Sequence, residues 1–438
     1  MQFPNISPSR FPHRLQVLIV WLAMTLLGLL IFNLSAIDTP ASEWVPAKPD
    51  YLKHVSLWDA TWYHRIVIGG YPDKLSYYET NGHVRQNTWA FMPVFPLLGK
   101  TLASMVSDDV GRSYFACAVV VSWISSAAVA LGLDAWLCPR VGKRASLLGV
   151  ALFFSFAPAI IMQVAYAESL TLALLTFGFI LLTKRRFIWA VMLFGIAELT
   201  RPIGVPLGAT IGLWWFWEEL RARGIVSPTS RFNSSFLPFK KSADVAATAP
   251  QTATTALDIS PTPLSQKDRI WLFVTAIITC AGALFWPAFA WFITGVPTAY
   301  TDTETTWRGS GHLAPFEPWI KEATTFGGPN SGIVALIAVL VLSICALSSS
   351  QLRKLGRLAW MWCVCYWVYL LVFFDPSSSI LRMLLAMAPL AWVLGAKLSN
   401  HLRAAVAFIA LSIVSQVLWI AWIWDAYSLS LSKIYWTP

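Results

Sequence analysis

Charged side chains are scarce in this 438-residue sequence. Asp, Glu, Lys and Arg make up 12% of it, whereas soluble globular proteins contain roughly 25%. Hydrophobic residues make up 57%, and the mean hydropathy is +0.60. A chain of this composition cannot cover its surface with groups that water solvates, so much of that surface must face lipid. Because apolar blocks recur along the whole sequence, we predict a single all-α, polytopic membrane domain over residues 1–438.

The sequence also lacks the patterns that mark several common kinds of site. It contains no phosphate-binding glycine signature, zinc-binding spacing or Gly-x-Ser-x-Gly elbow. Cys363 and Cys365 lie two positions apart on a predicted helix and would point to different sides, which disfavours a metal pair. None of the six cysteines lies in a predicted outer loop, so a disulfide framework is not expected. We predict no cofactor and assign no metal ligand, although Asp302, Glu304 and Asp375 leave a metal requirement open.

Apolar segments long enough to span a bilayer, about 20 residues each, number about 11. The segment 188–217 is interrupted by Arg201-Pro202 and has basic residues on both sides, so it predicts two short helices that meet at Arg201. The predicted segments are 15–34, 113–136, 145–165, 168–183, 188–217, 270–293, 331–348, 358–374, 380–396 and 404–424.

The net charge of +10 reflects Lys and Arg residues that lie in short clusters between the apolar segments. Such clusters orient a membrane protein with its basic loops inside, and they do not suggest a nucleic-acid partner. The distribution places the N-terminus inside and the C-terminus outside. Residues 225–268 then form a cytoplasmic loop whose Ser, Thr, Ala and Pro content predicts disorder. Residues 35–112 form a long outer loop, in which we expect short interfacial helices.

The densest motif of that outer loop runs Trp58-Asp59-Ala60-Thr61-Trp62-Tyr63-His64-Arg65. Aromatic rings here, and Tyr71 after them, could simply anchor the chain at the membrane–water boundary. That explanation does not account for Asp59, because partial desolvation of a carboxylate costs free energy. Desolvation also raises a carboxylate's pKa and makes it a better proton acceptor, so Asp59 is the candidate catalytic base.

Several other polar residues fall on the same predicted side of the membrane. Glu168 and Ser169 follow Tyr166-Ala167, where Glu168 could cap a helix or contact a substrate. Arg201 needs an anionic partner, for which Glu168, Glu198 and a lipid phosphate are candidates. Arg382 could snorkel to the surface or bind phosphate through its fork of donors. The outer set also includes Asp302, Trp307, Arg308, His312 and Asp375.

Two of these motifs resemble a known family. Trp58-Asp59-Ala60 with Tyr63, Gly70-Tyr71 and the later Phe91-Met92-Pro93-Val94-Phe95-Pro96 are similar to the pattern of GPI mannosyltransferase II, the phosphatidylinositol-glycan class V family. The region from Tyr166 to Gly204 is similar too, with weaker likeness from Gly295 to Trp307 and at Arg382. The resemblance covers about residues 15–400. This sequence departs from the family pattern at Met92, a position at which the family has a second aromatic residue. The loop 225–268 resembles an insertion.

The resemblance implies a multi-helix glycosyltransferase of the GT-C superfamily. Such an enzyme takes a sugar, here mannose, from a polyprenyl-phosphate carrier on the outer or lumenal face and inverts the anomeric centre. Its acceptor would be a glycolipid or a lipid-linked glycan. Length and charge pattern fit a bacterial plasma-membrane member, and a eukaryotic one would lie in the endoplasmic reticulum membrane. Asp59 matches the position of the family's catalytic outer-loop carboxylate.

Residues and resemblance together suggest one division of roles. Asp59 accepts the proton of the acceptor hydroxyl, while Arg201 and Arg382, with Arg65 or His64, stabilise the departing phosphate. The residues expected to contact substrate are Trp58, Trp62, Tyr63, Tyr71, Glu168, Ser169 and Trp307. The rival hypothesis is a transporter or flippase of lipid-linked sugars, which would call for charges deep in several helices and for repeated halves. The sequence shows no convincing repeat.

Overall fold

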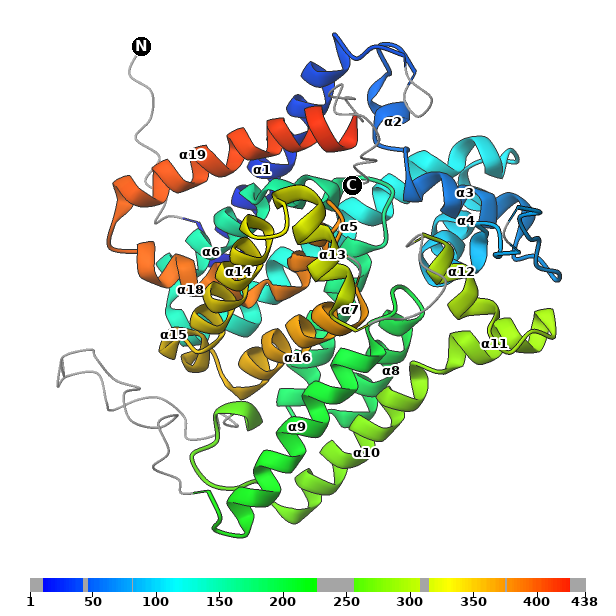
Figure 1. The fold of residues 1–438 in the computed structure, drawn as a ribbon. Coiled ribbons are helices and arrows are strands. Elements are labelled where there is room, and N and C mark those ends of the chain that lie inside the picture. The colour runs from blue at the N-terminus through cyan, green and yellow to red at the C-terminus, as the bar shows by residue number, and fades with distance from the viewer. Residues whose placement is uncertain are drawn as a thin grey trace, which may run out of the picture.

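The computed structural model describes residues 11–41, 46–80, 82–226, 256–307, 315–374 and 376–425. Within these residues the chain is built from helices, and its β-structure is limited to an isolated antiparallel bridge between Tyr77 and Val84 (Figure 1). Asp375, Arg308 and His312, which the sequence analysis assigned to the outer side, lie outside the described residues.

Five helical segments are long and apolar enough to cross a membrane. They are α1 (His13–Ala36), α5 (Val110–Val141), Gln266–Thr294, Ser331–Lys354 and Leu402–Trp424. The last three comprise α10 (Gln266–Gly282) with α11 (Phe285–Thr294), α14 (Ser331–Leu347) with α15 (Ser350–Lys354), and α19 (Leu402–Trp419) with a π-helical turn (Ile420–Trp424). Each coincides with a predicted apolar segment, so the prediction of a polytopic all-α membrane protein is confirmed.

Two further segments are bent pairs of helices. In the first pair, α6 (Lys143–Ser155) meets the 3₁₀ helix Ala157–Gln163 at 86°, and in the second, Ile380–Met387 meets α18 (Pro389–Leu398) at 71°. If each pair is one span, the described residues contain up to seven spans by length and composition. Shorter apolar helices add to these, and the predicted total of about 11 stays a prediction. The shorter ones are α4 (Val94–Val106), α7 (Glu168–Thr183), α8 (Phe187–Glu198) and α16 (Arg357–Phe373).

The break predicted at Arg201-Pro202 is present. Helix α8 ends at Glu198 and α9 (Gly204–Ala222) begins at Gly204. Pro202 has no N–H to continue the helical ladder, and the chain turns so that the Ile203 N–H donates to the Arg201 carbonyl at 2.7 Å. This turn presents Arg201 at the end of two helices rather than in the middle of one.

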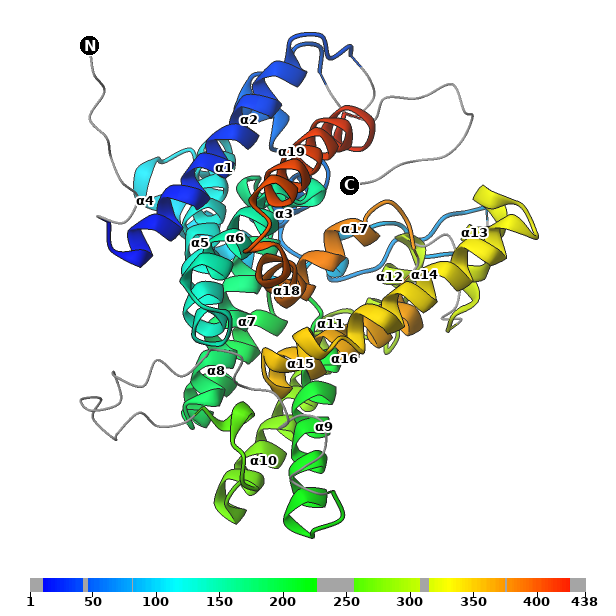
Figure 2. The ribbon, with the colours of Figure 1, turned by 90° about the vertical axis from the view of Figure 1, so that its left-hand side faces the viewer.

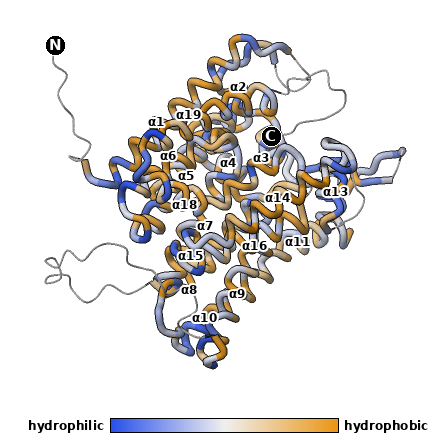
Figure 3. Tube along the Cα trace, turned by 60° about the vertical axis from the view of Figure 1, so that its left-hand side comes forward, coloured by the Kyte–Doolittle hydropathy of each residue, from blue (hydrophilic) through white to orange (hydrophobic). Residues whose placement is uncertain are grey.

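Helices α9 and α10 lie side by side in both ribbon views (Figures 1 and 2). Their close approach depends on small residues, because a Cβ added at Gly208 would come within 2.2 Å of the Cys280 sulfur. Hydrophobic colour runs along most of the helices in Figure 3, whereas hydrophilic colour gathers at several helix ends and connections. This pattern is the one expected of a chain whose helix ends lie in water and whose helix bodies face lipid or the core.

The predicted outer loop contains short helices, as expected. These are α2 (Tyr51–His54), α3 (Asp59–Gly69), a 3₁₀ turn (Thr88–Ala90) and α4. Helix α4 is the longest of them, and it packs on α5. The loop is therefore a folded unit that rests on the membrane-spanning helices.

The prediction of disorder over residues 225–268 does not hold for the C-terminal part of that range. Residues 227–255 lie outside the described residues, but 256–268 form a 3₁₀ turn (Leu257–Ile259) and the start of α10. Asp258 in this turn is buried and accepts two hydrogen bonds from the Arg140 guanidinium at 2.9 and 3.0 Å. An ion pair with a residue of α5 therefore fixes a segment whose composition alone predicted disorder.

Candidate active site

Asp59 is the first residue of α3, and the contacts of its neighbours set its position. Trp58 precedes the helix with a positive φ of 57°, a strained conformation for a bulky residue. Two hydrogen bonds hold it there: the Trp58 ring nitrogen donates to the Trp424 carbonyl, and the Thr61 hydroxyl donates to the Trp58 carbonyl, both at 2.8 Å. The Asp59 N–H donates to the Tyr166 hydroxyl at 3.3 Å. Strain of this kind concentrates at functional sites.

Four charged residues from distant parts of the sequence meet at this point; we call them the charged cluster. Arg382 Nη1 lies 2.7 Å from Asp59 Oδ2, and Arg382 Nε lies 3.2 Å from Glu168 Oε1. Arg201 Nη1 lies 2.6 Å from the same Glu168 oxygen. The Glu168 and Arg382 side chains are 6% and 8% exposed, whereas those of Arg201 and Asp59 are 19% and 23% exposed. One side of the cluster is therefore buried, and the other is accessible to a ligand.

The charged cluster carries two positive and two negative charges. Burying any one of these charges alone would be costly, and the mutual pairing offsets that cost. Glu168 Oε2 is nevertheless buried and has no hydrogen-bond partner among the described residues. Buried polar atoms normally have partners, so this carboxylate oxygen retains an unused capacity to accept a hydrogen bond.

The sequence analysis left three candidates for the partner of Arg201. The structure gives it Glu168, whereas the Glu198 carboxylate lies against Gly282 on α10. The second guanidinium nitrogen of Arg201 contacts the Met383 sulfur at 3.6 Å. Arg382 does not snorkel to the surface, because its side chain is buried between two carboxylates.

An aromatic wall adjoins α3. The Trp62 ring stacks on Phe91, with 5.7 Å between ring centroids, and meets Trp307 edge-on at 5.0 Å. The Arg65 guanidinium lies over Trp62 at 4.1 Å, a cation–π contact. Trp62, Arg65 and Trp307, which the sequence analysis picked from two separate loops, thus lie together.

Tyr63 lies between this wall and the charged cluster. Its ring meets Phe91 and Phe95 edge-on, and the charges of Arg201, Asp59, Glu168 and Arg382 all act on its hydroxyl. Burial raises the pKa of Tyr63, so its phenol stays a neutral hydrogen-bonding group at physiological pH.

Three other residues that were predicted to contact substrate or phosphate have side chains that contact backbone carbonyls. The His64 ring nitrogen Nε2 is 3.0 Å from the Gly111 carbonyl, and the ring stacks on Phe115. The Tyr71 hydroxyl donates to the Phe91 carbonyl at 2.9 Å. The Ser169 hydroxyl is buried and donates to the Met162 carbonyl at 2.7 Å. These contacts tie α3, the Phe91 segment and α7 to their neighbours.

The sequence analysis missed the C-terminal contribution to the site. The Trp424 carbonyl holds the Trp58 ring, and the Trp424 ring nitrogen donates to the His54 carbonyl at 2.8 Å. Buried His54 Nε2 lies 2.5 Å from one carboxylate oxygen of Asp425, and the other oxygen accepts from the Ser35 hydroxyl at 2.6 Å. His54 and Asp425 are 371 positions apart, and no motif in the sequence links them. Tyr166 was part of a noted motif, but only the structure shows that it contacts Asp59.

Replacing Asp425 by Ala should destabilise the protein. The change leaves the buried His54 ring and Ser35 hydroxyl without their shared acceptor, at a cost of about 1–3 kcal/mol per unpaired group. It should also loosen the segment that holds Trp58. Thermal unfolding of the purified protein in detergent would measure the effect, with Ser35→Ala as the milder control. An unchanged unfolding temperature for Asp425→Ala would contradict this account of the contact.

A separate group of potential metal ligands lies where α1 begins. The His13 ring nitrogen Nε2 is 2.9 Å from Asp134 and 3.5 Å from the Cys138 sulfur. Asp134 also accepts from the Ser146 hydroxyl at 2.6 Å. The two partners of His13 belong to α5, and on the predicted topology the group lies on the inner side. It is separate from the charged cluster.

We found no protein-family model that matches the chain and no curated protein that matches it in sequence. Two crystal structures of an Archaeoglobus fulgidus oligosaccharyltransferase are similar in fold, one in complex with zinc and sulfate and one tethered to an acceptor peptide. Both show a TM-score of 0.44 and 14% identity. They cover 92% and 94% of this chain, which spans 53% and 55% of theirs. The chain thus spans about half the length of these proteins, and so distant a match carries no functional argument.

Proposed function

We propose that the protein is a GT-C-type glycosyltransferase. It transfers a sugar, mannose, from a polyprenyl-phosphate donor to a glycolipid or lipid-linked glycan acceptor on the non-cytoplasmic face, with inversion. The observation that carries the proposal is the charged cluster, in which Asp59 lies 2.7 Å from Arg382. It combines a proton acceptor with two cations at the end of a membrane-spanning bundle, which is what this reaction needs.

In the proposed reaction the acceptor hydroxyl attacks the anomeric carbon of the donor sugar. The new glycosidic bond forms as the bond from that carbon to the phosphate oxygen breaks. The hydroxyl proton passes to Asp59, and the electron pair of the broken bond stays on the phosphate. No metal ion or redox step is needed to balance this reaction.

The pairing between Asp59 and Arg382 couples proton transfer from the acceptor to departure of the phosphate. Before reaction, the contact with Arg382 orients the Asp59 carboxyl group. When Asp59 takes up the proton, it loses the charge that attracted Arg382. The guanidinium is then free to stabilise the charge that develops on the leaving phosphate, together with Arg201. Glu168 holds both guanidiniums in place, and its unpaired oxygen is available for a substrate hydroxyl.

In this proposal the aromatic wall packs against the donor's sugar or its lipid chain. Trp307, which is exposed, offers apolar surface to the sugar ring or to the first isoprene units, and Trp62 supports it edge-on with Arg65 over its own ring. Trp58, anchored to the Trp424 carbonyl, fixes the start of α3 at Asp59, and the Tyr63 hydroxyl interacts electrostatically with Asp59. His64, Tyr71 and Ser169, whose side chains bond to backbone carbonyls, position these elements.

The decisive experiment uses the purified protein in nanodiscs with radiolabelled polyprenyl-phosphate-mannose and a panel of glycolipid acceptors. We expect transfer of label to at least one acceptor, with inverted configuration at the anomeric carbon. Polyprenyl-phosphate-glucose and polyprenyl-phosphate-arabinose test the choice of sugar. Movement of the intact donor across liposome membranes without transfer to any acceptor would overturn the proposal in favour of a flippase.

A further inference from the structure

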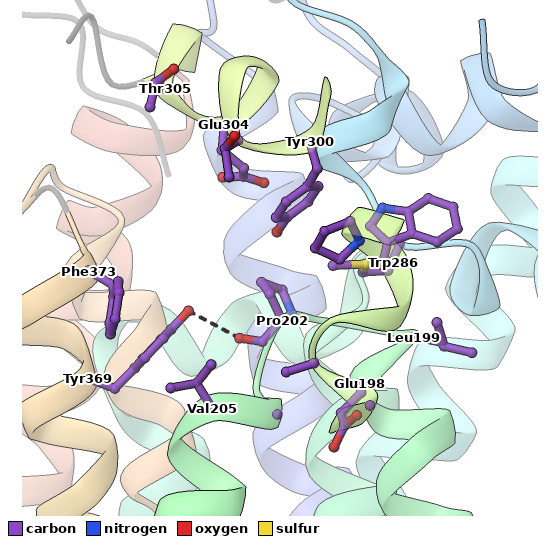
Figure 4. A pocket seen from close by; sticks show the side chains of 16 residues that line it. Glu198, Leu199, Pro202, Val205, Trp286, Tyr300, Glu304, Thr305, Tyr369 and Phe373 are labelled. Atoms are coloured by element: carbon purple, nitrogen blue, oxygen red, sulfur yellow. Dashed lines mark hydrogen bonds between the residues drawn. The ribbon is translucent and has the colours of Figure 1, made fainter. Parts of the chain in front are cut away.

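A cavity of about 170 Å³ lies beside the break between α8 and α9 (Figure 4). It borders Pro202, the residue after Arg201 of the charged cluster. Its other walls come from α11, from α12 (Ala299–Trp307) and from α16. The Tyr369 hydroxyl of α16 donates to the Pro202 carbonyl at 3.1 Å, which ties this wall to the break. The cavity therefore adjoins the proposed reaction centre.

The lining of the cavity is acidic. It includes the carboxylates of Glu198 and Glu304 and, among the described residues, contains no Lys, Arg or His. A phosphate would find no cation among these residues and would be attracted to Arg201 and Arg382 instead. The two neighbouring regions thus suit different parts of the reactants.

The remaining lining residues suit a sugar ring. The rings of Trp286, Tyr300, Tyr369 and Phe373 form apolar walls, which match the C–H faces of a pyranose or cyclitol. The hydroxyls of Thr301 and Thr305, together with the carboxylates, provide groups that pair with ring hydroxyls. A neutral ligand that is rich in hydroxyls fits this combination better than an anion or a bare lipid chain.

Glu198 is the residue that most clearly points to a ligand. Its side chain is buried, and its Oε1 atom has no hydrogen-bond partner among the described residues. The surrounding helices make room for it, because a Cβ at Gly282 would lie 2.1 Å from Glu198 Oε2, and one at Gly204 would lie 3.0 Å from its carboxyl carbon. A buried carboxyl without a partner costs free energy, and a hydroxyl of a bound sugar would recover it.

We infer that this cavity is the acceptor subsite and that it binds a neutral, hydroxyl-rich ring of the acceptor, a hexose or an inositol. The inference rests on the proposed function and adds where the acceptor binds. Glu198 and Glu304 accept hydrogen bonds from ring hydroxyls, and the aromatic residues pack on the ring. The reacting hydroxyl then extends past Pro202 toward Asp59.

Glu198→Gln and Glu304→Gln test this inference because they keep side-chain volume and replace each carboxyl group by an amide. We expect each to raise the KM for the acceptor about tenfold, the factor that corresponds to the net contribution of one hydrogen bond. The KM for the donor and the slow hydrolysis of the donor by water should stay unchanged. Glu317→Gln, an exposed residue of α13 (Glu317–Gly327), is the matched control. A raised donor KM with an unchanged acceptor KM would overturn the inference.

A binding measurement separates this inference from the proposed function. Saturation-transfer NMR on the protein in nanodiscs would compare octyl mannoside, a neutral probe, with mannose 6-phosphate, an anionic one. We expect binding of the neutral probe that Glu198→Gln and Gly282→Ala both weaken, even if no transferase activity is found. Preference for the anionic probe, or neutral-probe binding that neither variant changes, would show that the cavity is not this subsite.

Discussion

Replacing Asp59 by Asn is expected to reduce turnover about 10²–10⁴-fold, because loss of a general base has effects of that size. The Asn side chain keeps the shape of Asp59 and still accepts a hydrogen bond from Arg382, so the protein should remain folded. Donor binding should change little. Steady-state transfer by the purified variant, with donor affinity measured separately, checks the prediction.

Asp50→Asn is the matched control for that experiment. Asp50 precedes α2 in the same predicted loop, where its carboxylate accepts from the Lys53 N–H at 2.9 Å, but it is exposed and its ion pair is with Lys53 rather than with the charged cluster. Its replacement should leave turnover unchanged. Near-normal transfer by Asp59→Asn, or an equal loss in both variants, would remove Asp59 from the role of base.

Replacing Arg382 by Met is expected to affect stability and activity together. The change leaves Glu168 and Asp59 without their shared cation, and breaking a buried ion pair from one side costs about 3–5 kcal/mol. Turnover should fall about 10²–10³-fold, the range seen when one stabiliser of a developing negative charge is removed. Chemical denaturation and transfer assays on the same preparation would measure the two effects.

A second substitution separates these two effects. Arg382→Met combined with Glu168→Gln removes one positive and one negative charge, so stability should recover in part while turnover stays low. Arg403→Met, at an exposed residue at the start of α19, is the control and should change neither quantity. Recovery of turnover along with stability would mean that Arg382 has only a structural role.

Residue type alone predicted several local features correctly. The apolar segments fall where the helices lie, and Pro202 ends a helix because its ring removes a backbone donor wherever it stands in a chain. Residues 35–112, the predicted outer loop, were expected to contain short helices, and their described part does. These features depend on neighbours within a few positions, so a single sequence is enough to predict them.

The pairing of charges could not be predicted in this way. Arg382 and Asp59 are 323 positions apart, and Arg201 has Glu168 as its partner although Glu198 is much closer in the sequence. Which carboxylate an Arg meets depends on how the helices pack against one another, because the side chain of Glu198 leaves α8 toward α10. The ordered turn around Asp258 was missed for the same reason, since its partner Arg140 comes from α5.

The sequence by itself determined that this chain is an all-α membrane protein and where its long apolar helices lie. Composition and proline positions act locally, so they needed no knowledge of the fold. Only the tertiary structure decided that Asp59 meets Arg382, that Trp424 holds Trp58, and that a cavity lined by Glu198 and Glu304 borders the break after Arg201. Those contacts join residues hundreds of positions apart, and they exist only because the packed helices exclude water and bring their ends together.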